Sequence, residues 1–453
     1  MITGKGCCVY MDNKKSTAVL LAGAGKACIN PPAECFPFVP NASNAKASGT
    51  PGRSEIHDDC FVRLLILDNG EARSVIASFD LPIPPATEQT KAIIRGITKT
   101  PDENILLCAT HNHDYPFDYS SFVDAIYDGV KKAAADAVEA LRPAKYGFGE
   151  GESHINMNRD FQTEDGNWTA YNSTKGFSDK TLAVVKIVDE ENRLIAAVLN
   201  YCAHAVLVTS HLDSDGKLKL SSDFPGYAAN YIERRYGNGA VVLWTSGASG
   251  DQNPAITPYL LRYADDGYVI RERMPNGMAF KLIESLGGQH AIDAIRILKS
   301  IDANKKELPI KTKECSVYLP TQKAPDGADM RKNRMLVDHL VPYGPNGERL
   351  EGEIVKMIDT PDEKAKVDIK LFQLGDISMV CFADELYCKL GYKIKLASPE
   401  KNTIVVTLTS AEKHRGYILD KESADHNTFQ SFGIYKPGAC DEILINGVKQ
   451  LFD

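Results

Sequence analysis

Short runs of apolar residues, each bounded by turn residues, recur along the chain and predict β-strands. Between the first two runs the chain reads Asp68-Asn69-Gly70, whose glycine suits the tight turn of a hairpin. Similar runs continue into the last quarter of the sequence. We therefore expect strands at residues 60–67, 73–80, 104–109, 182–188, 194–201, 240–245, 367–374, 377–382 and 403–408.

Apolar residues spaced by three or four positions predict helices between these strands. In one such segment Val123, Ile126 and Val130 follow this spacing, and the pattern stops at Pro143, as a helix should. The helices that we expect cover residues 88–97, 121–141, 225–236 and 279–301. The polar segment 321–352 is expected to cover the surface, and the chain beyond residue 408 to form a loop-rich tail.

Strands interleaved with long helices predict an α/β fold, in which a layered mixed β-sheet forms the core and helices surround it. We find no internal repeat, and no Pro-, Gly- or Ser-rich linker long enough to separate two units. The sequence therefore predicts a single domain over residues 1–453.

The charge of the chain excludes some classes of function. The 52 Lys and Arg are outnumbered by 60 Asp and Glu, and no run of Lys or Arg exceeds two residues. Because a nucleic-acid-binding surface needs a basic stripe, nucleic acid is not an expected partner. The longest apolar stretch, residues 17–25, is about half of the ~20 residues that a membrane span needs. We expect no membrane span.

Two features favour a cytoplasmic protein. The first 15 residues lack the basic and apolar regions of a secretory signal. The 11 cysteines are odd in number and contain no C-x-x-C pair, which is typical of reduced, buried thiols.

The segment LLCATHNHDYP, residues 106–116, carries the first candidate chemistry. A buried strand is expected to end at Ala109, and in extended backbone His111 and His113 would project to the same side. Two adjacent imidazoles suit a metal ion. An H-x-H pair alone is a weak signal for a metal, because a surface pair or a hydrogen-bonded pair in a loop is the simpler interpretation.

His204 and Glu385 are polar residues in otherwise apolar surroundings. His204 interrupts the run LNYCAHAVLV, where a core histidine bonded to a backbone carbonyl is the alternative. Glu385 follows a predicted strand, where it can serve a site at the sheet edge or act as an ordinary acid at a helix start. Zinc sites commonly combine histidines with a carboxylate and leave one position for water.

Several segments, taken in order, resemble the neutral/alkaline non-lysosomal ceramidase family. They are LAGAGKACINPP, IHDDCFVRLLILDNGEARSVIASFDL, ATHNHDYP, NMNRD, NYCAHAV, SSDFPGYA, SGASGDQNP, FADELY and HRGYI, and together they run from about residue 22 to residue 438. The resemblance implies the fold of the ceramidase catalytic domain. It also implies one zinc ion held by four residues, which here are His111, His204, Glu385 and Tyr417.

The resemblance further implies two catalytic groups beside the metal. The second histidine of the T-H-x-H motif is His113, which would hold or shuttle a proton. The arginine of the Asn-Arg motif is Arg159, which would stabilise the carbonyl oxygen as it gains charge. From the residues alone, Arg159 next to Asp160 is equally well a surface ion pair.

The sequence departs from the family pattern at two places. The family motif G-D-V-S-P-N carries a serine that contacts substrate, and Asn253 replaces it here. Asn253 is expected to be one of the catalytic residues. Because an amide can form hydrogen bonds but cannot attack a carbonyl, the nucleophile is expected to be zinc-bound water. The family's S-G-P after T-H-T-H is Asp114-Tyr115-Pro116 here. Asp114 is expected to contact an imidazole or to line an altered substrate pocket.

We also expect Asp223 and Asp251 to bind substrate with Asp114; a helix cap is the alternative for Asp223. Secreted ceramidases add an immunoglobulin-like C-terminal domain, for which this sequence offers no counterpart, so we expect a small soluble substrate. The leading hypothesis is a zinc-dependent hydrolase of an amide or ester bond. A zinc-binding ligand sensor or scaffold without turnover is the main alternative, and a different divalent metal is another. The oligomeric state is not predicted.

Overall fold

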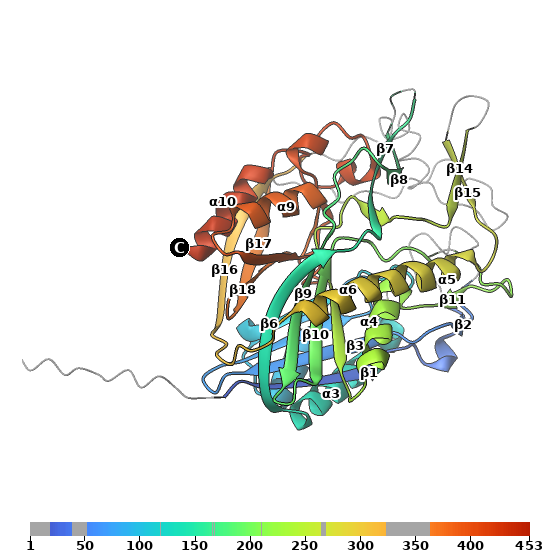
Figure 1. Cartoon of the computed structure of the whole chain (residues 1–453). Helices are drawn as coiled ribbons and strands as arrows, with labels where there is room; N and C mark the ends of the chain where they lie inside the picture. The colour runs from blue at the N-terminus through green and yellow to red at the C-terminus, as the bar shows by residue number, and fades with distance from the viewer. Residues whose placement is uncertain are drawn as a thin grey trace, which may run out of the picture.

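Two halves of one curled sheet face each other at the centre of the molecule (Figure 1). The computed structural model describes residues 19–38, 52–322 except 118, 165, 167, 210 and 264–268, and residues 363–453. The strand order of the sheet is β12-β10-β9-β6-β1-β3-β4-β5. Its strands are β1 (Leu21–Cys28), β3 (Phe61–Asp68), β4 (Arg73–Phe79), β5 (Ile105–Ala109), β6 (Arg142–Glu152), β9 (Thr181–Asp189), β10 (Leu194–Tyr201) and β12 (Val241–Ser246).

The sheet is mixed, as predicted. Strand pairs β4–β5 and β10–β12 are parallel, and the other neighbours are antiparallel. β1 and β6 share only the pairs Leu21–Pro143 and Ala22–Arg142, so the sheet bends there and β12 lies against β3, β4 and β5. Ser78 of β4 donates a hydrogen bond to the carbonyl of Trp244 in β12, which joins the two halves directly.

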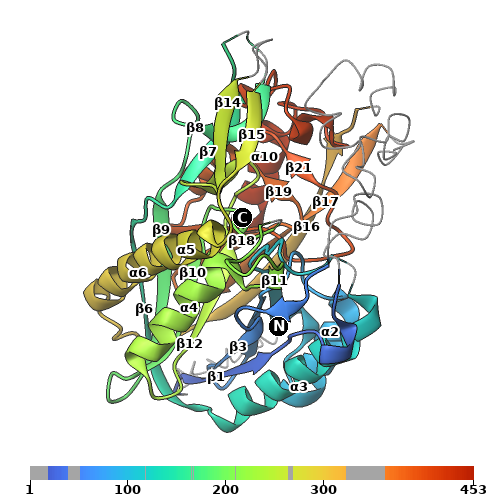
Figure 2. The ribbon, with the colours of Figure 1, turned by 90° about the vertical axis from the view of Figure 1, so that its right-hand side faces the viewer.

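Helices cover the outer face of each half (Figure 2). Helices α2 (Thr87–Thr98) and α3 (Val123–Glu139) pack on the half that contains β1 and β3. Helices α4 (Asp223–Tyr236), α5 (Met278–Leu282) and α6 (Gly288–Ser300) cover the half that contains β10. The apolar stripes of these helices and the apolar faces of the strands form two separate cores, because each amphipathic element must bury one side.

A second sheet closes the central core. It has the order β16-β17-β18-β20, and helices α9 and α10 cover its far side. Side chains of this sheet such as Phe372, Met379 and Val406 pack between the two halves of the larger sheet. The elements are β16 (Ile310–Pro320), β17 (Lys364–Leu374), β18 (Ile377–Cys381), β20 (Asn402–Val406), α9 (Cys388–Ala397) and α10 (Asp441–Phe452).

Short strands and turns fill the end of the molecule that carries the predicted site residues. They form the sheets β13-β7-β8, β14-β15, β11-β2 and β19-β21. Their bounds are β2 (Glu55–Ile56), β7 (Asn156–Gln162), β8 (Trp168–Ser173), β11 (Lys219–Leu220), β13 (Gln252–Pro254), β14 (Tyr259–Tyr263), β15 (Val269–Arg273), β19 (Glu385–Leu386) and β21 (Tyr417–Ile418). The 3₁₀ turns are η1 (Ala33–Cys35), η2 (Asp102–Asn104), η3 (Ser120–Phe122), η5 (Lys421–Ser423) and η6 (Phe429–Phe432).

The predicted layered α/β class is confirmed, and each predicted strand is present within a few residues of its expected bounds. The helix expected over 279–301 is interrupted by a π-helical turn, Ile283–Gly287, and the one expected over 121–141 begins with η3. The expectation of a loop-rich tail was wrong at its end, because residues 441–452 form the amphipathic helix α10. Most of the predicted surface segment 321–352 lies outside the described residues. The single domain stays a prediction.

Within the described residues, no helix combines the length and the hydropathy needed to cross a bilayer. The nine cysteines that the structure describes are all free thiols. This agrees with the predicted reduced state, whereas the cytoplasmic location stays a prediction.

Close packing of α3 on β1 depends on glycine. A Cβ atom on Gly25 would lie 2.0 Å from the carbonyl oxygen of Ala133 in α3, whereas one on Gly96 in α2 would meet nothing within 4 Å. We expect Gly25→Ala to lower the free energy of unfolding by about 1–3 kcal/mol through overpacking. The control Gly96→Ala should raise it by about 0.5–1 kcal/mol through helix propensity. Chemical denaturation measures both, and equal stabilities would contradict the packing argument.

Candidate metal centre

Three strands of the two sheets end near one another and deliver the predicted ligands. His111 follows β5, His204 follows β10, and Glu385 lies four residues after the last residue of β18. The loops after β5 and β10 are joined directly, because the backbone N–H of His113 donates to the carbonyl of Ala205 at 3.1 Å. The central core therefore fixes the relative positions of residues that are far apart in sequence.

His111 and His113 approach each other through a turn. The expectation of extended backbone was wrong, because His111 has φ of 60° and residues 113–114 lie in a turn. The left-handed region costs roughly 1–2 kcal/mol for a residue with a side chain. The turn brings the Nε2 atoms of the two rings to 3.0 Å from each other. Strained backbone of this kind is often found at functional sites.

Backbone carbonyls fix the orientation of two imidazoles. The Nδ1 atom of His111 lies 2.7 Å from the carbonyl oxygen of Pro82, and Nδ1 of His204 lies 3.1 Å from that of Gln252. Because a carbonyl only accepts, each Nδ1 carries the proton and donates. In the neutral rings both Nε2 atoms then present lone pairs, which is the arrangement that metal-binding histidines adopt.

The carboxylate of Glu385 faces these lone pairs. Its Oε2 atom lies 3.0 Å from Nε2 of His204 and 3.2 Å from Nε2 of His111. Three acceptor atoms at such distances repel one another unless a proton or a cation lies among them. Two nitrogen donors and a carboxylate fit a zinc ion well, so the residues present suit the metal that the family resemblance implies.

His113 belongs to the same cluster. Single nitrogen atoms of His111, His113 and His204 all lie within 4.8 Å of one another, so these three residues could also hold an ion. This set shares His111 and His204 with the predicted set. The ligand assignment stays a prediction, with His113 beside it as either a third nitrogen ligand or a proton carrier.

The protonation states support a cation site. Burial, followed by the nearby charge of Arg159, lowers the pKa of His204 to about 3. Burial and the neighbouring imidazoles also hold the pKa of His113 well below its usual value. Burial opposes ionisation of Glu385, but the imidazoles of His111, His204 and His414 outweigh it and keep the pKa of that carboxyl well below its usual range. The lowered pKa values of His113 and His204 keep these two rings neutral, which is the form of imidazole that binds metal.

Tyr417 and Arg159 line the other side of the cluster. Glu385 and Tyr417 are direct partners in the β19–β21 ladder, and the two side chains interact. The Nη2 atom of Arg159 lies 3.3 Å from Nε2 of His204, and the guanidinium is 5.5 Å from the Tyr417 ring centre. Burial and the charge of Glu385 raise the pKa of Tyr417. Arg159 is 6% exposed and is not a surface ion pair.

The three aspartates expected to bind substrate are buried and bonded to the chain itself. Asp114 pairs with Arg53 and accepts from the backbone N–H of Ser221 at 2.7 Å. Asp223 accepts from the N–H groups of Leu207 and Val208 at 2.8 and 3.2 Å. In this structure both carboxylates anchor the loops that carry His113 and His204. A role for either of them in substrate binding stays a prediction.

Asp251 connects the strand of Arg159 to the segment of Glu385. Its backbone carbonyl accepts from the N–H of Arg159 at 2.8 Å, and its carboxylate accepts from the N–H of Cys388 and from Asn158, both at 2.7 Å. Burial, followed by the charge of Asp160, raises the pKa of Asp251 to about 8. The G-D-Q-N segment therefore positions groups on both sides of the cluster.

Asn253 lies on β13, one residue beyond the carbonyl that orients His204. Its side-chain amide donates to Oδ1 of Asn172 at 3.3 Å, and the residue is partly exposed. A part for Asn253 in catalysis stays a prediction.

Sequence reasoning missed His414. Its Nε2 atom lies 3.2 Å from Oε1 of Glu385, the carboxylate oxygen that does not face His111 and His204. Its position three residues before Tyr417 was a usable signal. The carbonyls of Pro82 and Gln252 left no signal, because every residue has one.

Comparisons with known proteins identify the fold. No protein-family model matches the chain. The chain is 27% identical over 164 residues to neutral ceramidase A of Dictyostelium discoideum, which covers 32% of this chain and 22% of that protein. The crystal structure of neutral ceramidase from Pseudomonas aeruginosa matches with a TM-score of 0.68 and 18% identity, over 95% of this chain and 74% of that chain. The chain resembles neutral ceramidase and has its fold.

A second solved structure, a ceramidase complexed with C2, matches with a TM-score of 0.64 and 17% identity, over 96% of this chain and 75% of that chain. The neutral ceramidase fold confirms the resemblance found in the sequence motifs. The chain spans about a fifth of the curated relative's length, so its activity has to be argued from the site.

The site predicts that metal content depends on His111 and His204. We expect His111→Ala and His204→Ala each to reduce bound metal from about one equivalent to less than a tenth, because each removes an oriented nitrogen donor. Mass spectrometry of the metal in purified protein measures this. His154→Ala changes an exposed histidine paired with Glu152 and should keep the metal. A full equivalent of metal in both site variants would contradict the assignment.

Proposed function

We propose that this chain is a zinc-dependent hydrolase that cleaves an amide or ester bond in a small soluble substrate. The observation that carries the proposal is the fixed orientation of His111 and His204, whose Nε2 atoms both face the carboxylate of Glu385. The likeness to neutral ceramidases supports hydrolysis as the reaction class. In the proposal His111, His204, Glu385 and Tyr417 hold the ion.

Bound zinc would supply a water of lowered pKa and would polarise the substrate carbonyl. His113 is neutral at physiological pH because burial depresses its pKa, so it can accept a proton there. Its ring contacts that of His111 and lies 5.4 Å from Phe117. We assign to His113 the movement of a proton between the attacking water and the leaving group.

Arg159 supplies the positive charge for the carbonyl oxygen. Its Nε donates to the carbonyl of Gly250 at 3.1 Å, and its guanidinium packs 5.4 Å from the ring centre of Phe429. These contacts hold a buried cation beside the cluster without a direct carboxylate partner among the described residues. Such a fixed charge stabilises an oxyanion more strongly than water does.

A zinc-binding sensor or scaffold without turnover is the second candidate. Asn253 favours it, because Asn253 stands where the family has a substrate-contacting serine. Arg159 favours an enzyme, because it holds a buried positive charge beside the histidines, where it can stabilise a carbonyl oxygen that gains charge. Asn253 is also our reason to propose a substrate other than ceramide.

The proposal is tested by turnover with defined substrates and metals. Full-length protein is stripped with a chelator, reloaded with zinc, manganese or magnesium, and assayed with short N-acyl amines, short esters and a short-chain ceramide. We expect zinc-restored hydrolysis of an amide or ester. Zinc binding without any turnover would favour the sensor, restoration only by manganese or magnesium would favour the other metals, and ceramide as the best substrate would overturn the substrate proposal.

Arg159 gives a specific kinetic prediction. We expect Arg159→Met to lower kcat by about 10²–10³-fold, the usual cost of removing one oxyanion-stabilising group. Bound zinc should be unchanged, since no ligand is removed. Arg193→Met, which alters an arginine that is about half exposed, is the control and should leave kcat unchanged. Unchanged kcat in Arg159→Met would exclude the proposed role.

A further inference from the structure

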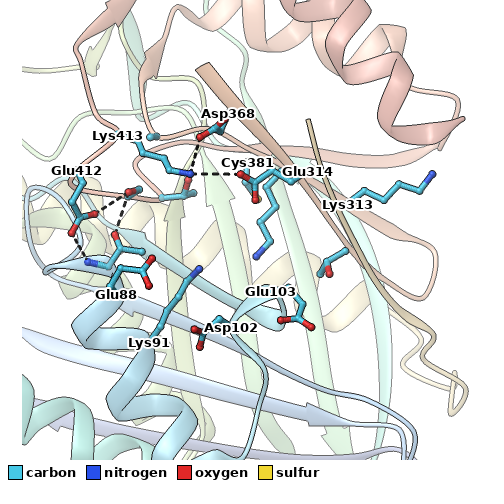
Figure 3. A pocket seen from close by; sticks show the side chains of 16 residues that line it. Glu88, Lys91, Asp102, Glu103, Lys313, Glu314, Asp368, Cys381, Glu412 and Lys413 are labelled. Atoms are coloured by element: carbon cyan, nitrogen blue, oxygen red, sulfur yellow. Dashed lines mark hydrogen bonds and ion pairs between the residues drawn. The ribbon is translucent and has the colours of Figure 1, made fainter. Parts of the chain in front are cut away.

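A cavity separate from the candidate metal centre lies between the N-terminal and C-terminal halves of the chain. It has a volume of about 430 Å³ and is lined by α2, η2, β16, β17 and the loop that follows β20 (Figure 3). Its lining includes none of the predicted metal ligands. This volume falls in the range of sites that hold small metabolites.

Some of the charged groups in this cavity are already paired. Lys413 lies 2.7 Å from Asp368 and 3.6 Å from Glu314, and dashed lines mark both ion pairs in Figure 3. Glu412 accepts from the backbone N–H of Thr87 at 2.7 Å. Asp102 pairs with Arg95. These paired groups stabilise the walls of the cavity, and their charges are already engaged by partners within the protein.

Lys370 and Lys91 line the same cavity, and the part of the chain that the structure describes offers neither of them an ion pair. Among the described residues, Lys370 on β17 donates one long hydrogen bond of 3.4 Å to the carbonyl of Ile105, and its ammonium lies 5.4 Å from the ring centre of Phe372. Lys91 on α2 forms no ion pair with any residue that the structure describes. Burial, followed by the charge of Lys91, lowers the pKa of Lys370 to about 8, although the nearby charges of Glu314 and Glu103 act in the opposite direction. Two ammonium groups thus repel each other across one cavity.

We propose that this cavity binds a small molecule through a single oxyanion group, a carboxylate or a phosphate, held by Lys370 and Lys91. An oxyanion would remove the repulsion between the two ammonium groups and replace their lost solvation with charge-assisted hydrogen bonds. Glu88 and Glu103 line the same cavity and form no ion pair among the described residues. They disfavour polyanions, so the ligand carries one anionic group. The proposal does not depend on the hydrolase activity.

Binding is tested by calorimetry on the full-length protein with benzoate and phenyl phosphate, and with neutral benzamide as a shape control. We expect saturable binding of at least one anion with a Kd of about 5 mM or tighter, weak but measurable. Which of the two binds more tightly distinguishes carboxylate from phosphate. No saturable binding of either anion, or equal binding of benzamide, would overturn the proposal.

Variants locate the site. Lys370→Met and Lys91→Met should each weaken anion binding at least tenfold. Lys313→Met is the matched control, because Lys313 lines the same cavity but its ammonium points away from the other labelled side chains in Figure 3. Its affinity should stay within twofold of the wild type. Undiminished binding in both Lys370→Met and Lys91→Met would exclude this cavity.

A second measurement uses the unmodified chain and needs no variant to fold. Lysine acetylation is followed by mass spectrometry with and without the anion that binds. We expect saturating anion to slow acetylation of Lys370 and Lys91 at least threefold and to leave Lys313 unaffected. Equal rates at all three lysines with and without anion would contradict the proposal.

Discussion

Two hydrogen bonds from imidazole to backbone carbonyl determine what the site can do. They place the protons of His111 and His204 on Nδ1 and leave both Nε2 lone pairs facing Glu385. In this buried place the two Nε2 atoms lie 3.0 and 3.2 Å from Oε2 of Glu385, and a guanidinium N–H of Arg159 lies 3.3 Å from Nε2 of His204. The fold therefore holds together a buried cluster of two imidazole nitrogens and a carboxylate, which a divalent ion would stabilise.

Buried carboxylates hold the loops that carry these histidines. Asp114, Asp223 and Asp251 each accept backbone N–H groups from segments that are distant in sequence. Loops at strand ends have few hydrogen bonds of their own, so such anchors replace the missing ladder. A burial-raised pKa near 7 for Asp223 and near 8 for Asp251 shows that the anchors carry a cost of desolvation. The geometry of the cluster therefore depends on residues that need not touch substrate.

Apolar runs and ordered motifs were the most informative features of the sequence. Regular apolar runs predicted six of the eight strands of the larger sheet, all but β1 and β6, and the ordered motifs predicted that His111, His204, Glu385 and Tyr417 would converge. β1 was missed because its small residues, LAGAGKAC, show neither bulk nor alternation. The turn at His111 was also missed, since a left-handed residue other than glycine leaves no clear pattern. Carbonyl partners such as that of Pro82 are invisible in any sequence.

The most direct measurement is anomalous diffraction at the zinc absorption edge from a crystal of the full-length chain. The account predicts one anomalous peak that lies about 2.0–2.1 Å from Nε2 of His111 and from Nε2 of His204. A carboxylate oxygen of Glu385 should also lie within bonding distance of this peak. A zinc-loaded crystal with no peak there, or with the two imidazoles turned so that Nε2 points away from Glu385, would contradict it.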